Sequence, residues 1–374
     1  MKIAIIGTNA SSILGFRKDL IISLINNGHE VFAFAIDFTD DDRKAVKHLG
    51  AMPIDYKLKR AGLNPIHDIK TLFQLKRLFL NIKPDIVFSY FSKPVIFGTL
   101  AAVLARIPKK IAMLEGLGFT FTEQLKPMSI KTKVIKYIQI YLYKLAFPFL
   151  ERIIFLNNDD PKDLIIKYKI NVKEISVLGA IGLNLNDYPY SEPPVRPVRF
   201  IFIGRLLAEK GIYEYVAAAR IVKNKYPNVE FIILGGLDED NPGGLNQNQL
   251  NDVISDEIVI YPGHVKNVTD WLTKSSVFVL PSYREGLPRS TQEAMAIGRA
   301  VITTDAPGCR ETVKHGINGF IVPKYDANTL ANKMEYFVEN KEKIIEMGNE
   351  SHKQAIDKYN SYHVNLKLIS MIIE

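Results

Sequence analysis

Apolar runs and amphipathic segments alternate along the first half of the chain. The runs are short and rich in β-branched residues, as buried strands are, and the segments between them repeat apolar positions with a helical period. Strands that alternate with helices indicate a parallel sheet covered by helices on both faces. The strands predicted in this half are 2–7, 30–37, 85–90, 110–116 and 152–157, and the predicted helices include 16–27, 69–82 and 94–107.

This alternation stops near the middle of the chain and then begins again. Residues 186–199 hold four prolines and little periodicity, which is typical of a linker. Beyond them, a helix is predicted at 212–225 and a helical tail at 330–374. The strands predicted in this half are 199–204, 230–236, 257–263, 277–282, 300–305 and 319–323.

The two series predict two Rossmann-like α/β domains with parallel sheets, at residues 1–185 and 186–355. The remaining residues, 356–374, are expected to form a helix that crosses back to the first domain. A length of 374 residues suits two domains better than one. Because ligands of open parallel sheets bind beyond the carboxyl ends of the strands, we expect the two sheets to face a central cleft.

Composition excludes several kinds of site. The single cysteine, Cys309, excludes an internal disulfide and a cysteine-cluster metal site, and fits a reducing compartment. The seven histidines are scattered, with no HExxH motif. The first predicted strand is not followed by GxGxxG, so classical dinucleotide binding is not expected. No apolar stretch reaches the roughly eighteen residues that span a membrane.

The net charge of +8 is placed unevenly. Residues 124–150 carry five lysines and no acid, and residues 57–70 form a second basic stretch. A helix over the first of these would lie on an anionic membrane surface, or would face the core with its lysines in solvent. Nucleic acid is not an expected partner, because no RNP, KH or zinc-finger pattern accompanies the charge. The apolar face of this helix would consist of Ile130, Val134, Ile138, Tyr141 and Leu145.

Two strand ends carry groups that suit a phosphate. In "FIGRLLAEKG", Arg205 and Lys210 follow a strand and precede a helix, where two cations would stabilise a departing diphosphate. The alternative is a surface loop with mobile cations. Gly7, at the end of the first strand, permits a close approach of the backbone to a ligand, or only a tight turn.

A third strand end, "REGLPRSTQEAMAIG", places Glu285 before a turn and Glu293 one turn inside a helix. Free N–H groups at a helix start bind anions. Glu293 would accept hydrogen bonds from ribose hydroxyls, and Glu285 would meet a sugar beyond the phosphates. The spacing therefore fits one extended ligand of ribose, diphosphate and sugar. The groups expected around its phosphates are Gly286, Leu287, Arg289 and Ser290.

The R-x4-K and E-x7-E patterns, with "GLNLNDY" (182–188) and residues 282–322, resemble the retaining GT-B glycosyltransferases of family 4. The resemblance implies that Arg205 and Lys210 bind the diphosphate, Glu285 the donor sugar and Glu293 the ribose. It implies that the strand end at His264 and Val265 contacts the base. It also implies a UDP-sugar as donor, no cofactor and no metal, and no DxD metal motif stands at a strand end here.

The motifs "RAGLNP" (60–65), "SKPVIFG" (92–98) and "EGLG" (115–118) are similar to those of a narrower group. These are bacterial transferases of the Campylobacter N-glycan type, which add an acetamido sugar to an undecaprenyl-diphosphate-linked sugar. Many family members have a histidine near Glu115, which here would bind or deprotonate the acceptor hydroxyl, or only cap a loop. The other acceptor contacts implied are Arg17, Arg60, Lys93, Gly116 and Gly118. The alternative for the three cations is that they are simply solvated at the surface.

These patterns predict a metal-independent transferase, peripheral at the cytoplasmic face of the inner membrane. It would move an N-acetylated hexosamine or deoxyhexosamine from UDP to the lipid-linked acceptor, in the assembly of capsule, O-antigen or glycan. Glu115, Arg205, Lys210 and Glu285 would take part in catalysis, with Glu285 as a sugar ligand and not a covalent nucleophile. A non-hydrolysing UDP-sugar 2-epimerase, a soluble family-4 enzyme and a non-catalytic nucleotide-sugar-binding subunit remain as alternatives.

Overall fold

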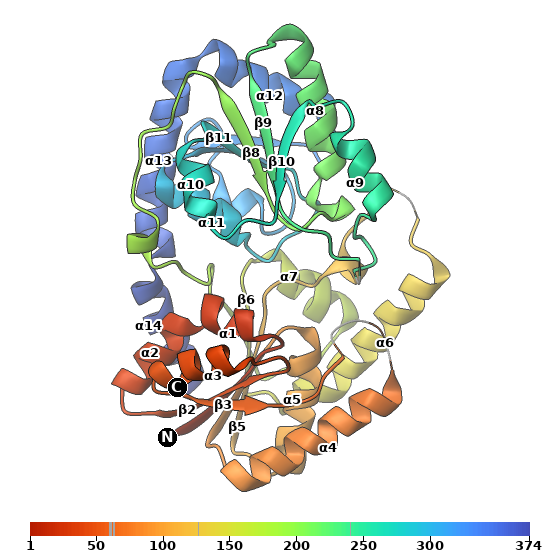
Figure 1. Ribbon diagram of the computed structural model, residues 1–374. Helices are drawn as coiled ribbons and strands as arrows, with labels where there is room; N and C mark the ends of the chain where they lie inside the picture. The colour runs from red at the N-terminus through yellow and green to blue at the C-terminus, as the bar shows by residue number, and fades with distance from the viewer. Residues whose placement is uncertain (60–61, 63, 126, 240) are drawn as a thin grey trace. The chain divides into compact units, whose positions relative to one another are not determined.

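The computed structural model describes residues 1–59, 62, 64–125, 127–239 and 241–374. They form two compact units, both of α/β class (Figure 1). Unit 1 consists of Met1–Thr120, Met128–Gly182 and Ser361–Glu374. Unit 2 consists of Phe121–Pro127 and Leu183–Asn360.

Unit 1 is built on a parallel sheet of seven strands in the order β3-β2-β1-β4-β5-β6-β7. The chain starts in the middle of this sheet, because β1 pairs with β2 on one side and β4 on the other. Both faces are covered by helices, so the central strands read as continuous apolar runs. The strands are β1 (Lys2–Ile6), β2 (Glu30–Ala35), β3 (Met52–Asp55), β4 (Ile86–Tyr90), β5 (Lys109–Leu114), β6 (Arg152–Phe155) and β7 (Glu174–Val177).

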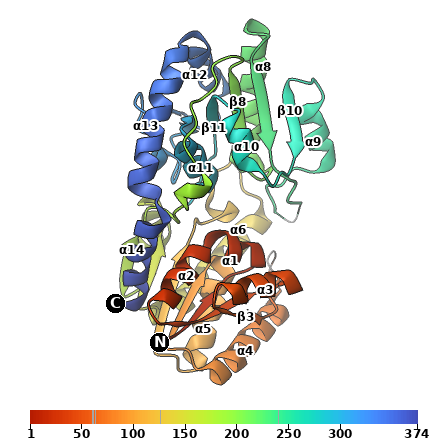
Figure 2. The same ribbon diagram turned by 60° about the vertical axis from the view of Figure 1, so that its left-hand side comes forward.

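The helices of unit 1 form two layers. In one layer α4 packs against α5 and α5 against α6, and in the other α14 packs against α2, as Figures 1 and 2 show. The terminal helix is fastened to the sheet, since Lys109 donates to the carbonyl of Ile373 and Arg152 to that of Met371. The helices are α1 (Ala10–Phe16), α2 (Lys18–Asn26), α3 (Asp40–His48), α4 (Pro65–Ile82), α5 (Ser92–Leu104), α6 (Ile130–Ala146), α7 (Asp159–Pro161) and α14 (Ser361–Ile373).

Unit 2 has a parallel sheet of six strands in the order β10-β9-β8-β11-β12-β13. Its strands are β8 (Arg199–Ile203), β9 (Glu230–Leu234), β10 (Val259–Gly263), β11 (Val277–Leu280), β12 (Ala300–Thr304) and β13 (Gly319–Val322). Its helices are α8 (Ile212–Lys225), α9 (Gln247–Ile254), α10 (Val268–Thr273), α11 (Arg289–Ile297), α12 (Ala327–Glu339) and α13 (Lys341–Tyr359). The predicted fold class, two parallel Rossmann-like sheets, is confirmed.

Two segments pack onto unit 2 in ways that their sequence did not indicate. Residues 121–127 belong to unit 2 although the chain on both sides of them belongs to unit 1. There Lys324 pairs with the carboxylate of Glu123 and Tyr325 donates to its carbonyl, both at 2.8 Å. The proline-rich segment predicted as a linker is also bonded to unit 2, for example from Ser191 N–H to the carbonyl of Ile297.

The first predicted helix, 16–27, is wrong at its start. The structure has α1 from Ala10 and α2 from Lys18, with a break between them at Arg17 (φ −119°, ψ 0°). At this break the side chain of Arg17 turns into the protein, where it is 1% exposed and forms an ion pair with Glu115. A continuous amphipathic helix would place an arginine on its solvent side.

The apolar face predicted for 124–150 does not face the core. Helix α6 buries Ile140, Tyr143 and Ala146, whereas Ile130 is 82% exposed and Tyr141 is 61% exposed. The interpretation in which this apolar face packs against the core and the lysines face solvent is therefore wrong, because the predicted apolar face is exposed. Among the helices that the structure describes, none has the length and apolar composition needed to cross a membrane.

We expect Leu368→Ala, on the buried side of α14, to lower the free energy of unfolding by about 3 kcal/mol, because it leaves a cavity in the core. Leu368 is 1% exposed, whereas Leu366 on the same helix is 47% exposed. Leu366→Ala is the matched control and should change stability by no more than about 0.5 kcal/mol. Urea unfolding followed by circular dichroism measures both, and equal small effects would show that α14 is not part of the core of unit 1.

Candidate functional site

The loops at the carboxyl edge of the sheet in unit 2 hold most of the predicted donor-side residues. Because all six strands are parallel, the loops that follow neighbouring strands emerge side by side at this edge. Arg205 follows β8, His264 follows β10 and Glu285 follows β11. The sheet thus brings together groups that are far apart in the sequence.

The central contact of this edge joins Lys210 to Glu285. The Lys210 Nζ atom lies 2.5 Å from Glu285 Oε1, and the Ser282 hydroxyl donates to the same oxygen at 2.7 Å. The two charged side chains are only 19% and 11% exposed. Although they are 75 residues apart, they meet because β8 and β11 are neighbours in the sheet. An ammonium has three donors, so Lys210 can bind a phosphate while it holds this carboxylate.

Two glycines keep the loops around this pair in backbone contact. Gly211 has φ +74°, and a Cβ atom there would lie 2.1 Å from the carbonyl oxygen of Pro281. Gly308 has φ +77°, and a Cβ atom would lie 2.2 Å from the carbonyl oxygen of Glu285. Any other residue would combine backbone strain with a steric clash at either position. The two close approaches therefore hold the segment from Pro281 to Glu285 between the loops that contain Gly211 and Gly308.

Arg205 has a different partner and a different environment. Its guanidinium lies 2.5 Å from Asp238 in the loop after β9, and its side chain is 55% exposed. The loops after β9 and β10 also meet, since a Cβ atom on Gly236 would lie 3.7 Å from the Cβ of His264. His264 is exposed and Val265 is half-buried. The two predicted base contacts thus lie at the open end of this edge, beside the Arg205–Asp238 pair.

The start of α11 has the properties of an anion site. Gly286 and Leu287 are buried in the turn before it, and Arg289 and Ser290 are its first two residues. Pro288 stands at the N-cap position, and no side chain of a described residue caps the helix. The positive end of the helix dipole favours an anion there.

Glu293 is held by two donors one turn further into the helix. The hydroxyl of Tyr188 and the Nε of Arg289 both donate to its Oε1, at 2.8 and 2.9 Å. Burial, and then the charge of Glu293, raises the pKa of Tyr188 to about 12, so this hydroxyl stays a donor at neutral pH. Tyr188, which lies 105 residues from Glu293, was not among the predicted site residues. The signal that could have indicated it is the motif "GLNLNDY", of which Tyr188 is the last residue.

A second cluster lies at the carboxyl edge of the sheet in unit 1. Arg17 is buried, pairs with Glu115 and lies with its guanidinium 4.3 Å from the ring centre of Tyr90. Arg17 is therefore not a solvated cation. Glu115 is not a loop acid in solvent either, since its side chain is 7% exposed.

The glycines of this cluster shape the backbone around that ion pair. Gly116 and Gly118, with φ of +123° and +75°, turn the chain directly after β5. The carbonyl of Gly7, at the end of β1, accepts a hydrogen bond from the hydroxyl of Tyr56. A Cβ atom on Gly7 would lie 2.2 Å from the hydroxyl of Tyr90, so any larger residue there would displace that side chain.

Lys93 lies at the start of α5 and is held in place. Its Nζ bonds to the Asp68 carboxylate at 3.0 Å and to the carbonyl of Lys59 at 2.9 Å. Arg60, the remaining predicted acceptor contact, lies outside the described residues. Within those residues, no group of three or more histidine, cysteine, aspartate and glutamate side chains could hold a metal ion.

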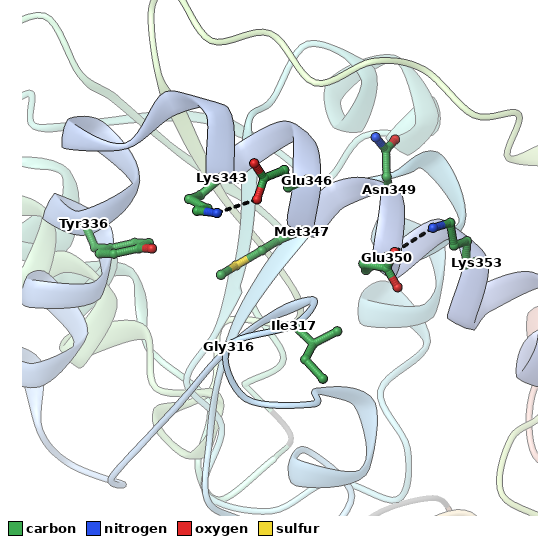
Figure 3. A pocket seen from close by; sticks show the side chains of 9 residues that line it. All are labelled: Gly316, Ile317, Tyr336, Lys343, Glu346, Met347, Asn349, Glu350 and Lys353. Atoms are coloured by element: carbon green, nitrogen blue, oxygen red, sulfur yellow. Dashed lines mark hydrogen bonds and ion pairs between the residues drawn. The ribbon is translucent and has the colours of Figure 1, made fainter.

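A surface hollow of about 560 Å³ in unit 2 lies away from these clusters (Figure 3). Gly316 and Ile317, which line it, precede β13 and so stand at the amino edge of the sheet. Its charged residues pair with each other, Lys343 with Glu346 and Lys353 with Glu350 (Figure 3). Because it lies at the opposite edge from Lys210 and Glu285, we assign it no part in the site.

Comparison with known proteins finds a glycosyltransferase family model for each unit. A family model described as "Glycosyl transferases group 1" matches residues 190–354, and one described as "Glycosyl transferase 4-like" matches residues 2–158. The N,N'-diacetylbacillosaminyl-diphospho-undecaprenol alpha-1,3-N-acetylgalactosaminyltransferase of Campylobacter jejuni is 29% identical over 95% of this chain and 94% of its own. The UDP-Gal:alpha-D-GlcNAc-diphosphoundecaprenol alpha-1,3-galactosyltransferase of Escherichia coli is 28% identical over 75% and 73%.

Solved structures with low identity share the fold. Anabaena HepE, in complex with UDP and glucose, is 15% identical, covers 99% of both chains and has a TM-score of 0.78. The sucrose-phosphate synthase of Thermosynechococcus elongatus is 16% identical, with a TM-score of 0.77 over 99% of this chain and 98% of its own. The resemblance predicted from the sequence is confirmed. Because two family models of glycosyltransferases together match most of the chain, one in each unit, the chain is a glycosyltransferase, and it has the GT-B fold.

Proposed function

We propose that this glycosyltransferase moves a sugar from a UDP-sugar to an undecaprenyl-diphosphate-linked sugar, with retention of configuration. The observation that carries the proposal is the Lys210–Glu285 pair, which puts a cation for the diphosphate next to a carboxylate for the sugar. The Campylobacter relative supports the acceptor, since its name gives a diphospho-undecaprenol-linked sugar, and the E. coli relative supports UDP. By the same likeness, the transferred sugar is an N-acetylated hexosamine or deoxyhexosamine.

The donor follows the carboxyl edge of the sheet in unit 2. Its ribose binds Glu293, whose carboxylate Tyr188 and Arg289 hold in place. Its diphosphate lies at the start of α11, where Lys210 and Arg205 offset the charge that develops as the diphosphate leaves. Glu285 binds the sugar hydroxyls. Two donors already occupy one oxygen of Glu285, which suits a sugar ligand better than a nucleophile.

The acceptor side uses the buried cluster of unit 1. Glu115 would bind the acceptor hydroxyl, with Arg17 holding its carboxylate, while Gly116 and Gly118 let the backbone come close. Lys93 would serve the acceptor diphosphate. The enzyme would act at the cytoplasmic face of the inner membrane, where the lysines and exposed apolar residues of α6 meet the lipid surface.

One experiment tests the reaction itself. The full chain is incubated with a panel of UDP-sugars and undecaprenyl-diphosphate-linked sugars in the presence of EDTA. Mass analysis then identifies the lipid product, and NMR identifies its anomeric configuration. We expect one donor to be transferred with retention and without added metal. Conversion of a UDP-sugar to its C2 epimer, without acceptor and with the UDP still attached, would indicate an epimerase instead. Binding of UDP-sugars without turnover of any would indicate a non-catalytic subunit.

We expect Arg205→Ala to lower kcat about a hundredfold, because one cation facing the leaving diphosphate is worth roughly 3 kcal/mol in the transition state. The partner variant Asp238→Asn is the control, since it removes the charge paired with Arg205 but keeps the cation. It should retain kcat within a few-fold. Steady-state kinetics with saturating acceptor measure both variants. Near-normal turnover of Arg205→Ala would remove Arg205 from the diphosphate site.

We expect Glu293→Gln to weaken both UDP and the UDP-sugar, and Glu285→Gln to weaken only the UDP-sugar. The ribose is common to both ligands, whereas the sugar is present in one. Tyr188→Phe should follow Glu293→Gln in a milder form, because it removes one of the two donors to that carboxylate. Tyr190→Phe is its control, since Tyr190 bonds to Asn349 instead. Calorimetry decides, and equal losses for both ligands in both glutamate variants would mean that the donor binds in another direction.

We expect replacement of Lys131, Lys133 and Lys144 by glutamine to weaken binding to anionic vesicles on the order of a hundredfold, at about 1 kcal/mol for each charge. Lys136 is left in place because it lies over the ring of Tyr168. The control replaces three exposed lysines elsewhere, Lys18, Lys47 and Lys266, with the same change in net charge. Co-sedimentation measures both. Parent-like binding of the α6 variant would remove the lysines of α6 from the membrane contact.

A further inference from the structure

Helix α4 in unit 1 presents its apolar residues to solvent. Ile66 is 68% exposed and Phe73 is 56% exposed, and Ile69 and Leu80 are about half exposed on the same side. These positions follow a helical spacing, so they form a stripe and not scattered contacts. Exposed apolar stripes of this kind mark surfaces that another body covers.

The same helix turns polar side chains inward. Asp68 and Thr71 are buried on its inner side, together with Leu75 and Phe79. The Asp68 carboxylate pairs with Lys93 at 3.0 Å, and the Thr71 hydroxyl donates to the carbonyl of Lys57 at 2.7 Å. These bonds fix the rotation of α4 about its axis. The polar contacts and the burial of Leu75 and Phe79 on the inner side together leave the stripe facing outward.

The charge on this side of α4 is positive. Lys70 and Arg77 are exposed among the apolar residues of the stripe. Asp68 is the only acid between Pro65 and Ile82, and it is buried. A surface that combines exposed isoleucine and phenylalanine with cations and no exposed carboxylate complements an anionic lipid interface.

Helix α6 continues this surface. Both α4 and α6 pack against α5, so they belong to one helix layer of unit 1 (Figure 1). Helix α6 also lacks acids and exposes apolar residues between its lysines. We define the α4–α6 surface by six exposed residues: Ile66, Ile69, Phe73, Ile130, Val134 and Tyr137.

We propose that α4 is a second membrane-contacting helix, and that the α4–α6 surface inserts into the headgroup region of an anionic phospholipid bilayer. The proposal rests on the proposed function for the identity of the acceptor, and assigns α4 the apolar part of the contact. Asp68 ties the start of α4 to Lys93 at the carboxyl edge of the sheet. The lipid contact is thereby fixed beside the residue that serves the acceptor diphosphate.

A second copy of the chain fits this surface less well. Two copies meeting through it would bring Lys70 and Arg77 close to the same residues or to the lysines of α6, with no exposed carboxylate on either helix to offset them. Like charges brought together in an interface cost several kcal/mol. Phospholipid headgroups supply the missing negative charge.

The test uses the full chain and the variant Ile69→Gln/Phe73→Gln. The matched control is Ile175→Gln/Leu366→Gln, whose two residues lie in unit 1 on β7 and α14 and are 42% and 47% exposed. Co-sedimentation is measured with vesicles of phosphatidylcholine that contain phosphatidylglycerol. We expect the α4 variant to lose roughly tenfold or more in partitioning, because it no longer buries two large apolar side chains. The control should bind like the parent.

Salt separates this contact from that of the lysines. Apolar burial is not screened, so the difference between parent and α4 variant should persist at high salt, where the lysine contribution shrinks. Parent-like vesicle binding of the α4 variant at all salt concentrations would overturn the proposal. So would a dimer of the parent, seen by analytical ultracentrifugation, that dissociates in this variant while vesicle binding stays unchanged.

Activity assays keep this proposal distinct from the proposed function. The α4 variant should transfer sugar to a short, water-soluble acceptor analogue at the parent rate, and should lose transfer to the long-chain acceptor in vesicles. If the parent transfers sugar to no acceptor at all, the proposed function fails while the vesicle measurements still decide the role of α4. Loss of transfer to the soluble analogue as well would overturn a role confined to lipid contact.

Discussion

The site in unit 2 depends on the pairing of β8 with β11. These strands are neighbours in the sheet although β9 and β10 lie between them in the chain, and their register places Val277 against Phe200. All strands are parallel, so this pairing brings the ends of β8 and β11 to the same edge. Lys210 and Glu285 meet there, and Gly211 lets the two loops approach closely enough for that contact. A change in this pairing would separate the cation from the carboxylate.

Ion pairs within each unit hold the candidate residues before any ligand arrives. The Arg205 side chain is 55% exposed, whereas that of its partner Asp238 is 10% exposed, so a phosphate can reach the guanidinium from the solvent side. Lys210 and Glu285 form a pair that is largely buried, and breaking it would leave a buried charge without a partner of opposite sign. In the proposed reaction, Arg205 therefore changes partner on binding, while Lys210 keeps Glu285 and adds the diphosphate.

All six strands of unit 2 were predicted from the sequence, whereas in unit 1 the central strands were predicted and the two edge strands were not. Strands β1, β4, β8 and β11 are buried on both faces, so each reads as an unbroken apolar run. Strands β3 and β7 lie at the edges of the sheet in unit 1, have four residues each and are partly exposed. Neither therefore contains an apolar run from which it could be predicted. The strand ends that carry Arg205, Lys210 and Glu285 followed from the same apolar pattern. Their roles in the reaction remain predictions.

Side-chain pairings across long sequence distances could not be predicted in the same way. Tyr188 and Glu293 come from different elements, and nothing in either local sequence specifies the other. Asp238 was not among the predicted site residues, since its partner Arg205 lies 33 residues away in another loop. Arg17 was expected in a helix, but its pairing with Glu115 places it at a break between two helices. In each case a tertiary contact overrides the local pattern.

Helices α4 and α6 show a further limit of pattern analysis. An amphipathic pattern identifies an apolar face, but it does not say whether that face meets protein or another medium. In α6 the predicted apolar face is exposed, and in α4 a buried Asp68–Lys93 pair and a buried Thr71 hold the polar side inward. Rotation of α4 to bury Ile69 and Phe73 would break those bonds and would also expose Leu75 and Phe79, which are both 0% exposed. The buried polar contacts and the packing of Leu75 and Phe79 together fix the orientation of α4 and keep a lipid-compatible stripe on the outside.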